Sequence, residues 1–437
     1  MQTTSATGGF MHIVMVSGEY PPRWGGMGSV VYHLAGHMAQ RGHKVTVITR
    51  KHKQMPPTQT GVEVIPVRWA PLPMSFTRSF GKHALKALKQ LDRRRSIDVV
   101  NAHLPLVSWT RNQFQFIEQK IAPVVSTLHG SWIGEREGVR RASMNRESAT
   151  WRNPNDLAIR LTAGWYARYE RAGVLESTCC VAVSRSTKKE FHEFYKIPDD
   201  SDIEVVHNGC DVRVFRPPNK DNEGEQLSHE RFRKEYGCAD EEALNYDPKT
   251  KTPMILAVGR LAARKGYVSL IRALPLILKE HENAKLIIVG RGHMKKRLLK
   301  VAEELGVQDS LFIKSAMSFE DLAQHYRSSD LVVFPSYYEG QGLIPLEALA
   351  SGTPVVTVNQ EPLTEMIDDS VGGLFDRGDY VGLAKAVCDE LNGHVQRIKK
   401  AKEGRKRVLE NFTLEGQAES YEDVFLRSVQ KRRWRDS

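Results

Sequence analysis

The chain alternates short apolar runs with stretches of helical periodicity, and this alternation occurs in both halves. Near-continuous apolar runs of this length are typical of strands buried on both faces of a parallel sheet. The helical stretches between them supply the crossover connections that parallel strands need. The predicted strands lie at 11–16, 44–49, 97–102, 122–128 and 179–183 in the first half, and at 254–258, 285–289, 311–314, 331–334 and 354–358 in the second.

Two successive sets of βα units predict two doubly wound α/β domains. A chain of 437 residues is also too long for one ordinary core. The turn-rich stretch 207–225 separates the two sets and contains the predicted boundary. In open α/β sheets ligands bind beyond the carboxyl ends of the strands, so the residues that follow each predicted strand are the first candidates for a site.

Composition narrows the class of protein. The formal charge of +11 favours an anionic partner, but no nucleic-acid-binding module is visible, so we expect no nucleic acid. No apolar run approaches the ~20 residues that span a bilayer. The N-terminus lacks a basic region followed by an apolar one, and we expect a cytoplasmic protein. Five scattered cysteines without CxxC spacing argue against a disulfide framework or a structural zinc site.

The segment 338–354 (YEGQGLIPLEALASGTP) contains the strongest candidates for ligand-binding residues. Pro345 is tolerated only in a first helical turn, which predicts a helix start near Gly342 or Leu343. The free amides of that turn suit a diphosphate. Glu339 could then accept hydrogen bonds from sugar hydroxyls, and Glu347 from a ribose. In the alternative reading, Glu347 only complements the helix macrodipole.

This segment resembles the E-x(7)-E motif of the retaining GT-B glycosyltransferases of family 4. The stretch from Gly259 to Gly266 (GRLAARKG) is similar to the family's G-R-L-x-x-x-K-G element. The resemblance implies that Arg260 and Lys265 hold the donor diphosphate. Two fixed cations can stabilise a departing diphosphate without a metal. Taken alone, these residues would read as ordinary loop cations.

Further motifs agree with the resemblance. His129 ends a predicted strand and is similar to the family's H-G element, although a lone histidine is usually structural. The glycine-rich loop around Gly26 lacks the G-x-G-x-x-G spacing of a dinucleotide site. The resemblance implies that His129, Arg260, Lys265 and Glu339 are catalytic and that Gly26, Gly259, Arg260, Lys265, Ala316, Met317, Glu339, Gly340, Gln341, Gly342, Leu343 and Glu347 bind the donor.

The resemblance implies a GT-B architecture of two facing Rossmann-like domains with parallel sheets and an interdomain cleft. Residues 1–208, completed by a C-terminal helix within 412–437, would bind the acceptor, and residues 209–411 the nucleotide-sugar donor. The implied reaction moves a hexosyl-type group from a UDP- or GDP-linked sugar to a hydroxyl of a small-molecule, glycan or lipid-linked acceptor. It retains configuration and uses no cofactor. A sugar phosphorylase, a nucleotide-sugar epimerase and a non-catalytic binding protein remain alternatives.

Two features bear on metals and membranes. Asp200 and Asp202 have D-x-D spacing, but they lie in a polar loop, so we expect no metal there. Residues 80–95 predict an amphipathic helix with one apolar and one basic face. Such a helix can lie on an anionic membrane surface, which would suit a lipid-linked acceptor. The alternative is that its apolar face packs on the first sheet and its lysines face water.

Overall fold

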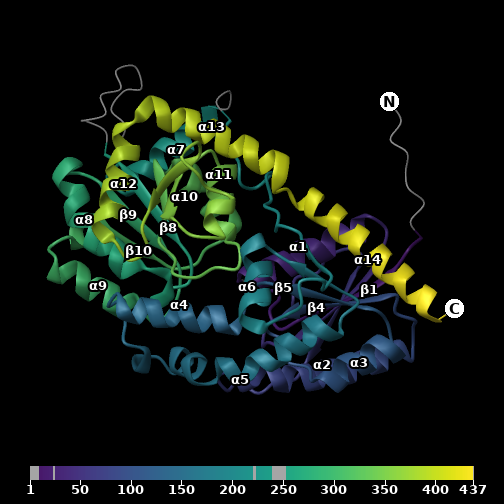
Figure 1. Cartoon of the computed structure of the whole chain (residues 1–437). Helices are drawn as coiled ribbons and strands as arrows, with labels where there is room; N and C mark the ends of the chain where they lie inside the picture. The colour runs from purple at the N-terminus through teal and green to yellow at the C-terminus, as the bar shows by residue number, and fades with distance from the viewer. Residues whose placement is uncertain (1–8, 23–24, 220–222, 239–251, 437) are drawn as a thin grey trace. The chain divides into compact units, whose positions relative to one another are not determined.

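The computed structural model describes residues 9–22, 25–219, 223–238 and 252–436. The chain folds into two compact units, each built around its own parallel sheet (Figure 1). The chain changes unit four times, and two of these changes fall inside helices, α4 (Trp132–Met144) and α5 (Pro154–Glu176). Unit 1 comprises Met1–Glu135, Leu161–Gly209 and Leu414–Ser437, and unit 2 comprises Arg136–Arg160 and Cys210–Thr413.

Unit 1 contains a seven-stranded parallel sheet with the order β3-β2-β1-β4-β5-β6-β7. All five strands predicted for the first half are present, so the predicted fold class is confirmed. The two strands that the sequence did not predict, β3 and β7, are the edges of the sheet. The strands are β1 (His12–Ser17), β2 (Lys44–Arg50), β3 (Val62–Val67), β4 (Val99–Leu104), β5 (Val124–Leu128), β6 (Cys179–Ala182) and β7 (Ile203–Val205).

Helices cover both faces of this sheet, which explains its near-continuous apolar runs. Ile13 and Met15 of β1 belong to a core formed with α1 and α14, whereas Val14 and Val16 belong to a second core formed with α2, α3 and α6. Successive side chains of a strand point to opposite faces, so both sets must be apolar. These helices are α1 (Gly26–Gln40), α2 (Ser75–Asp92), α3 (Arg111–Lys120), α6 (Arg185–Tyr195) and α14 (Leu414–Asp436).

Helix α2 is the predicted amphipathic helix. Its apolar residues Phe80, Ala84, Ala87, Leu88 and Leu91 are buried in the core of unit 1, as the 3.6-residue periodicity predicts. On the opposite side of the helix Lys82 and Lys86 are exposed to solvent, whereas Lys89 is half-buried, with its ammonium 3.8 Å from the centre of the Phe116 ring. Within the part of the chain that the structure describes, no helix is both long enough and apolar enough to cross a bilayer.

Unit 2 contains a six-stranded parallel sheet with the order β10-β9-β8-β11-β12-β13. Four of its strands have the predicted bounds, and β12 begins one residue later. Only β13, an edge strand, was not predicted. The strands are β8 (Met254–Val258), β9 (Lys285–Val289), β10 (Leu311–Lys314), β11 (Leu331–Phe334), β12 (Val355–Val358) and β13 (Gly372–Phe375).

The helices of unit 2 follow its strands, and one carries the glutamate-rich motif. Helix α11 begins directly after the loop that leaves β11, at the carboxyl end of the sheet. The remaining elements are α7 (Glu223–Glu235), α8 (Tyr267–Glu280), α9 (Lys295–Glu304), α10 (Phe319–Ser328), α11 (Leu343–Ala350), α12 (Tyr380–Asn392) and α13 (His394–Asn411), with the 3₁₀ turns η1 (Thr150–Arg152), η2 (Ala263–Lys265), η3 (Gln308–Ser310) and η4 (Leu363–Glu365).

Candidate functional site

The first turn of α11 forms one wall of the candidate site in unit 2. The helix begins at Leu343, as Pro345 predicted, and Gly342 is its N-cap. Gly342 has φ of +101°, a conformation that side-chain-bearing residues rarely adopt. No side chain caps the helix and no acidic residue lies in its first turn. Its leading amides and positive dipole end therefore suit an anion.

Lys265 and Glu339 form an ion pair beside this turn. The Lys265 Nζ bonds to Glu339 Oε1, and the two side chains are only 10% and 12% exposed. Burial alone would raise the pKa of Glu339, but Lys265 and Arg264 outweigh it and lower that pKa. Glu339 is therefore a carboxylate at neutral pH. Such a group can only accept hydrogen bonds, which suits the hydroxyls of a sugar.

Arg260 lies at the carboxyl end of β8, the neighbour of the strand β11 that leads to Glu339. Its side chain is exposed, in contrast to that of Lys265. Gly259 before it has φ of +138°, and a Cβ there would lie 2.9 Å from the Tyr267 hydroxyl. Tight packing on one side of this loop thus leaves the arginine on the solvent side.

The carboxyl group of Glu347 forms a hydrogen bond with a tyrosine. The Tyr326 hydroxyl donates to Glu347 Oε2 at 2.7 Å, and burial raises the pKa of Glu347 to about 7. Glu347 lies beyond the first turn of α11, which contains no acidic residue. The helix-dipole effect falls off within the first turn. The position of Glu347 therefore argues against the alternative that it only complements the helix macrodipole.

The remaining residues predicted to bind the donor lie in two loops of unit 2. Ala316 and Met317 follow β10, one of the two edge strands of the sheet, and the Ala316 carbonyl accepts a hydrogen bond from Arg291 at 3.3 Å. Gln341 as a whole residue is 3% exposed, and its side-chain amide points to the Met366 sulfur. Its side chain is therefore buried, and Gly340 precedes it in the same loop.

Sequence reasoning missed Glu147, which is fully buried in unit 2. Its carboxylate accepts hydrogen bonds from the backbone amides of Val268 and Ser269 at 2.8 and 2.9 Å. The Tyr337 hydroxyl lies 3.4 Å from the same carboxylate. Glu147 thus joins the start of α8, just after Lys265, to the residue two positions before Glu339. Because it lies more than 100 residues away in sequence, no motif could reveal it.

His129 of unit 1 belongs to a histidine pair that the sequence also did not reveal. It follows β5, and its Nε2 lies 2.9 Å from Nδ1 of His103 on the adjacent strand β4. The two rings stack with centroids 5.2 Å apart. Burial lowers the pKa of His129 to about 3 and that of His103 well below its usual value. Both imidazoles are therefore neutral at physiological pH, one donating and the other accepting.

Gly26 is the first residue of α1 and is exposed. Among the described residues, apart from its chain neighbours and the backbone of α1, no atom lies within 4 Å of the position that a Cβ on Gly26 would take. At the preceding Gly25, in contrast, a Cβ would overlap the carboxylate of Glu19. An acidic side chain therefore already lies at the N-terminal end of α1. Any anion near Gly26 would have to approach beside that carboxylate.

Comparison with known proteins identifies the family. The model of Glycosyltransferase Family 4 matches residues 24–214, and that of Glycosyl transferases group 1 matches residues 240–407. An uncharacterized glycosyltransferase of Methanocaldococcus jannaschii is 31% identical over 377 residues, which cover 84% of this chain and 85% of the relative. The chain belongs to glycosyltransferase family 4. It is a retaining GT-B enzyme that transfers a sugar from a nucleotide-sugar donor.

Two further likenesses span nearly all of this glycosyltransferase. The glycogen synthase of Mycobacterium tuberculosis is 29% identical over 439 residues, covering 95% of this chain and 94% of the relative. The sucrose-phosphate synthase of Thermosynechococcus elongatus has a TM-score of 0.75 at 19% identity and covers 98% of this chain and 100% of its own. At 19% identity, the similarity to the sucrose-phosphate synthase shows only that the two chains share a fold.

The D-x-D spacing of this glycosyltransferase lies outside the donor motifs. Asp202 directly precedes β7 and forms an ion pair with Lys431 of α14. The Asp202 carboxylate, which a metal ion would need as a ligand, is thus already paired with a lysine ammonium. All five cysteines are buried free thiols in the structure.

Proposed function

We propose that this glycosyltransferase moves a hexosyl group from a UDP- or GDP-linked sugar to an acceptor hydroxyl, without a metal. The donor would bind the C-terminal domain predicted at residues 209–411. The acceptor would bind the N-terminal domain at 1–208, with its C-terminal helix. The observation that carries the proposal is the buried Lys265–Glu339 pair beside the open first turn of α11.

The departing diphosphate gains negative charge as the glycosidic bond breaks. In the proposed reaction Lys265 turns from Glu339 to the diphosphate, Arg260 approaches from the solvent side, and the amides of Leu343 and its neighbours bind a phosphate oxygen. Preorganised donors in a site of low dielectric stabilise such charge most strongly. Glu339, released from the lysine, accepts a hydrogen bond from a sugar hydroxyl and fixes the ring.

The remaining predicted residues have lesser proposed roles. Glu347 accepts from the ribose, and the backbone at Ala316 and Met317 meets the nucleobase. His129 lies beside the transferred sugar as a neutral hydrogen-bonding group, and Gly26 leaves room for the donor phosphate. No protein base is assigned, because the acceptor hydroxyl can pass its proton to the departing phosphate during attack on the same face.

The donor is identified by thermal shift across nucleotide sugars, since a ligand at 100 times its Kd adds about 2.7 kcal/mol to the free energy of unfolding. The anomeric configuration of the product is then read by NMR. A product that forms only with inorganic phosphate would favour a sugar phosphorylase. Isomerised donor without transfer would favour an epimerase.

Metal independence is tested in the same assay. Arg260→Ala and Lys265→Ala should each lose about 2–4 kcal/mol of transition-state stabilisation, as measured by kcat/KM. Lys300→Ala, an exposed lysine of α9, is the matched control and should keep wild-type rates. Activity should persist in chelator. Activity that is lost in chelator and restored by a divalent ion would overturn this part of the proposal.

We also propose that α2 and the residues after it contact an anionic membrane surface. Lys82, Lys86 and Arg93 are exposed on the side of α2 opposite its buried face, and Arg94 and Arg95 continue the basic stretch. Each cation near such a surface contributes about 1 kcal/mol. A lipid-linked acceptor would then lie within reach of the enzyme.

Flotation with anionic and neutral vesicles at low and high salt tests this contact. Binding should require anionic lipid and low salt, and it should weaken in the triple variant Lys82→Gln/Lys86→Gln/Arg93→Gln. A triple glutamine variant of three exposed lysines of α13, Lys399, Lys402 and Lys406, removes the same charge from unit 2 and should still float. Equal loss in both variants would indicate non-specific attraction by net charge.

A further inference from the structure

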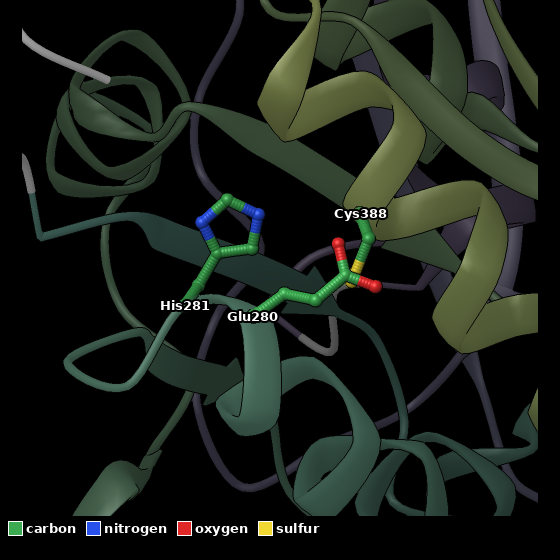
Figure 2. A group of neighbouring side chains, drawn as sticks. All are labelled: Glu280, His281 and Cys388. Carbon is green, nitrogen blue, oxygen red and sulfur yellow. The ribbon is translucent and has the colours of Figure 1, made fainter. Parts of the chain in front are cut away.

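Three metal-ligating side chains meet where α8 ends against α12. Glu280 is the last residue of α8, His281 is its C-cap, and Cys388 lies on α12. A carboxylate oxygen, an imidazole nitrogen and the sulfur all lie within 4.8 Å of one another. Figure 2 shows the Glu280 carboxylate next to the sulfur, with the His281 ring beside them. None of the three belongs to the donor motifs.

The contacts of this cluster leave a ligand position open. The His281 Nε2 is buried and has no hydrogen-bond partner among the described residues, an arrangement that costs free energy unless another group binds it. Cys388 is only 4% exposed. The Asn392 amide donates to Glu280 Oε2 at 3.2 Å, which orients the carboxylate as supporting residues of metal sites do.

A second cluster of similar composition provides a contrast. Cys179, Asp202 and Glu204 of unit 1 also lie within 4.8 Å of one another. There, however, Lys431 pairs with Asp202 and Arg427 pairs with Glu204 at 2.7 Å, so both carboxylates are already neutralised. Among the described residues, Glu280 has no ion pair within 4.0 Å. The two clusters therefore differ in whether a cation already lies within ion-pair distance of the carboxylates.

We propose that Glu280, His281 and Cys388 form a zinc site that fastens the C-terminal end of α8 to α12, with water as the fourth ligand. One thiolate, one imidazole and one carboxylate suit zinc better than the all-oxygen sets of magnesium or calcium. Zinc bonds to such ligands are about 2.0–2.3 Å long, so the three groups would close by about 1 Å. Cys388 releases its proton to solvent when it binds.

The experiment uses the full chain, stripped of metal and titrated with zinc against a chromophoric chelator. Wild type should bind one zinc ion per chain, and its thermal unfolding midpoint should rise with zinc. Cys388→Ser and His281→Ala should each weaken the affinity at least tenfold. Cys179→Ser, in the neutralised cluster, is the matched control and should bind as wild type does.

Cobalt(II) gives a second readout that does not depend on stability. Its thiolate charge-transfer band should appear in wild type and Cys179→Ser and be absent in Cys388→Ser. Equal affinity and equal spectra in all variants would mean adventitious binding only and would overturn the proposal. Nucleoside-diphosphate binding, measured on the same samples, reports the donor site separately, so failure of one proposal is distinguishable from failure of the other.

Discussion

The two units hold their polar side chains at the carboxyl ends of parallel strands by opposite means. In unit 2, Lys265 and Glu339 are charged, little exposed and paired with each other. In unit 1, His129 and His103 are kept neutral by burial and bond to each other. A buried charge persists only with a partner, whereas a buried imidazole can simply lose its proton.

This difference matches the chemistry proposed for each unit. A nucleoside diphosphate is anionic and gains charge as it leaves, so its site needs fixed cations and a carboxylate to organise them. The hydroxyls of the transferred sugar are neutral, and a neutral imidazole such as that of His129 can donate to them or accept from them. The contrast therefore predicts that charge-removing substitutions affect unit 2 far more than unit 1.

The largest effect is expected at Glu339. Glu339→Gln keeps the shape of the side chain but removes its charge and its ion pair with Lys265. It also weakens the hydrogen bond that Glu339 accepts from the sugar hydroxyl. Turnover should fall about 100-fold or more if that hydrogen bond is stronger in the transition state than in the ground state. Steady-state kinetics measure it, with Glu303→Gln on the exposed side of α9 as the control. Near-normal rates would remove Glu339 from the active site.

The next effect is expected at Glu147 and should appear first in stability. Glu147→Gln replaces one carboxylate oxygen with an NH₂ group, so that a donor faces a donating backbone amide of α8. A buried polar group left without a partner lowers the free energy of unfolding by about 1–3 kcal/mol. Thermal unfolding should therefore begin several degrees lower, and donor turnover should fall with it. Glu137→Gln breaks an exposed ion pair on α4 and should change little. Equal midpoints for the two variants would contradict the role given to the Glu147 network.

A smaller effect is expected from His129→Gln, which tests the neutral half of the comparison. Loss of one neutral hydrogen bond to the transferred sugar, worth about 1 kcal/mol, should lower kcat/KM for the nucleotide sugar by about five- to tenfold. Nucleoside-diphosphate binding, measured by calorimetry, should stay at the wild-type value. A loss of nucleotide affinity as large as that of Lys265→Ala would show that the contrast between the units is wrong.

The smallest effect is a pH dependence from Glu347. Its pKa is raised to about 7, so the carboxylate form grows as pH rises from 6 to 8. A carboxylate accepts a ribose hydrogen bond more strongly than the protonated acid does, so nucleotide affinity should increase about threefold over this range. Glu347→Gln should abolish this increment and keep only the titration of the nucleotide itself. Tyr326→Phe removes a hydrogen bond that lowers the pKa of Glu347 and should move the midpoint upward.

The sequence determined the central strands and the start of α11. The strands β8, β9 and β11 lie inside the sheet of unit 2 and have their predicted bounds, because such strands of a parallel sheet are buried on both faces and read as apolar runs. The edge strand β10 also has its predicted bounds, because its sequence LFIK keeps an apolar run. The strands that were missed, β3, β7 and β13, are sheet edges. An edge strand tolerates exposed and small residues, as Gly372 and Gly373 illustrate in β13, so its pattern is weak.

The resemblance of short segments to family 4 implied the roles of Arg260, Lys265 and Glu339, which stay predictions. Pro345 indicated the turn at Gly342, where α11 does begin. Only the tertiary structure brought Glu147 to the start of α8, His103 to His129, and Cys388 to Glu280 and His281. Each of these contacts joins residues from separate elements. Folding brings them together by burying apolar faces, so no local pattern of polar residues records which partners will meet.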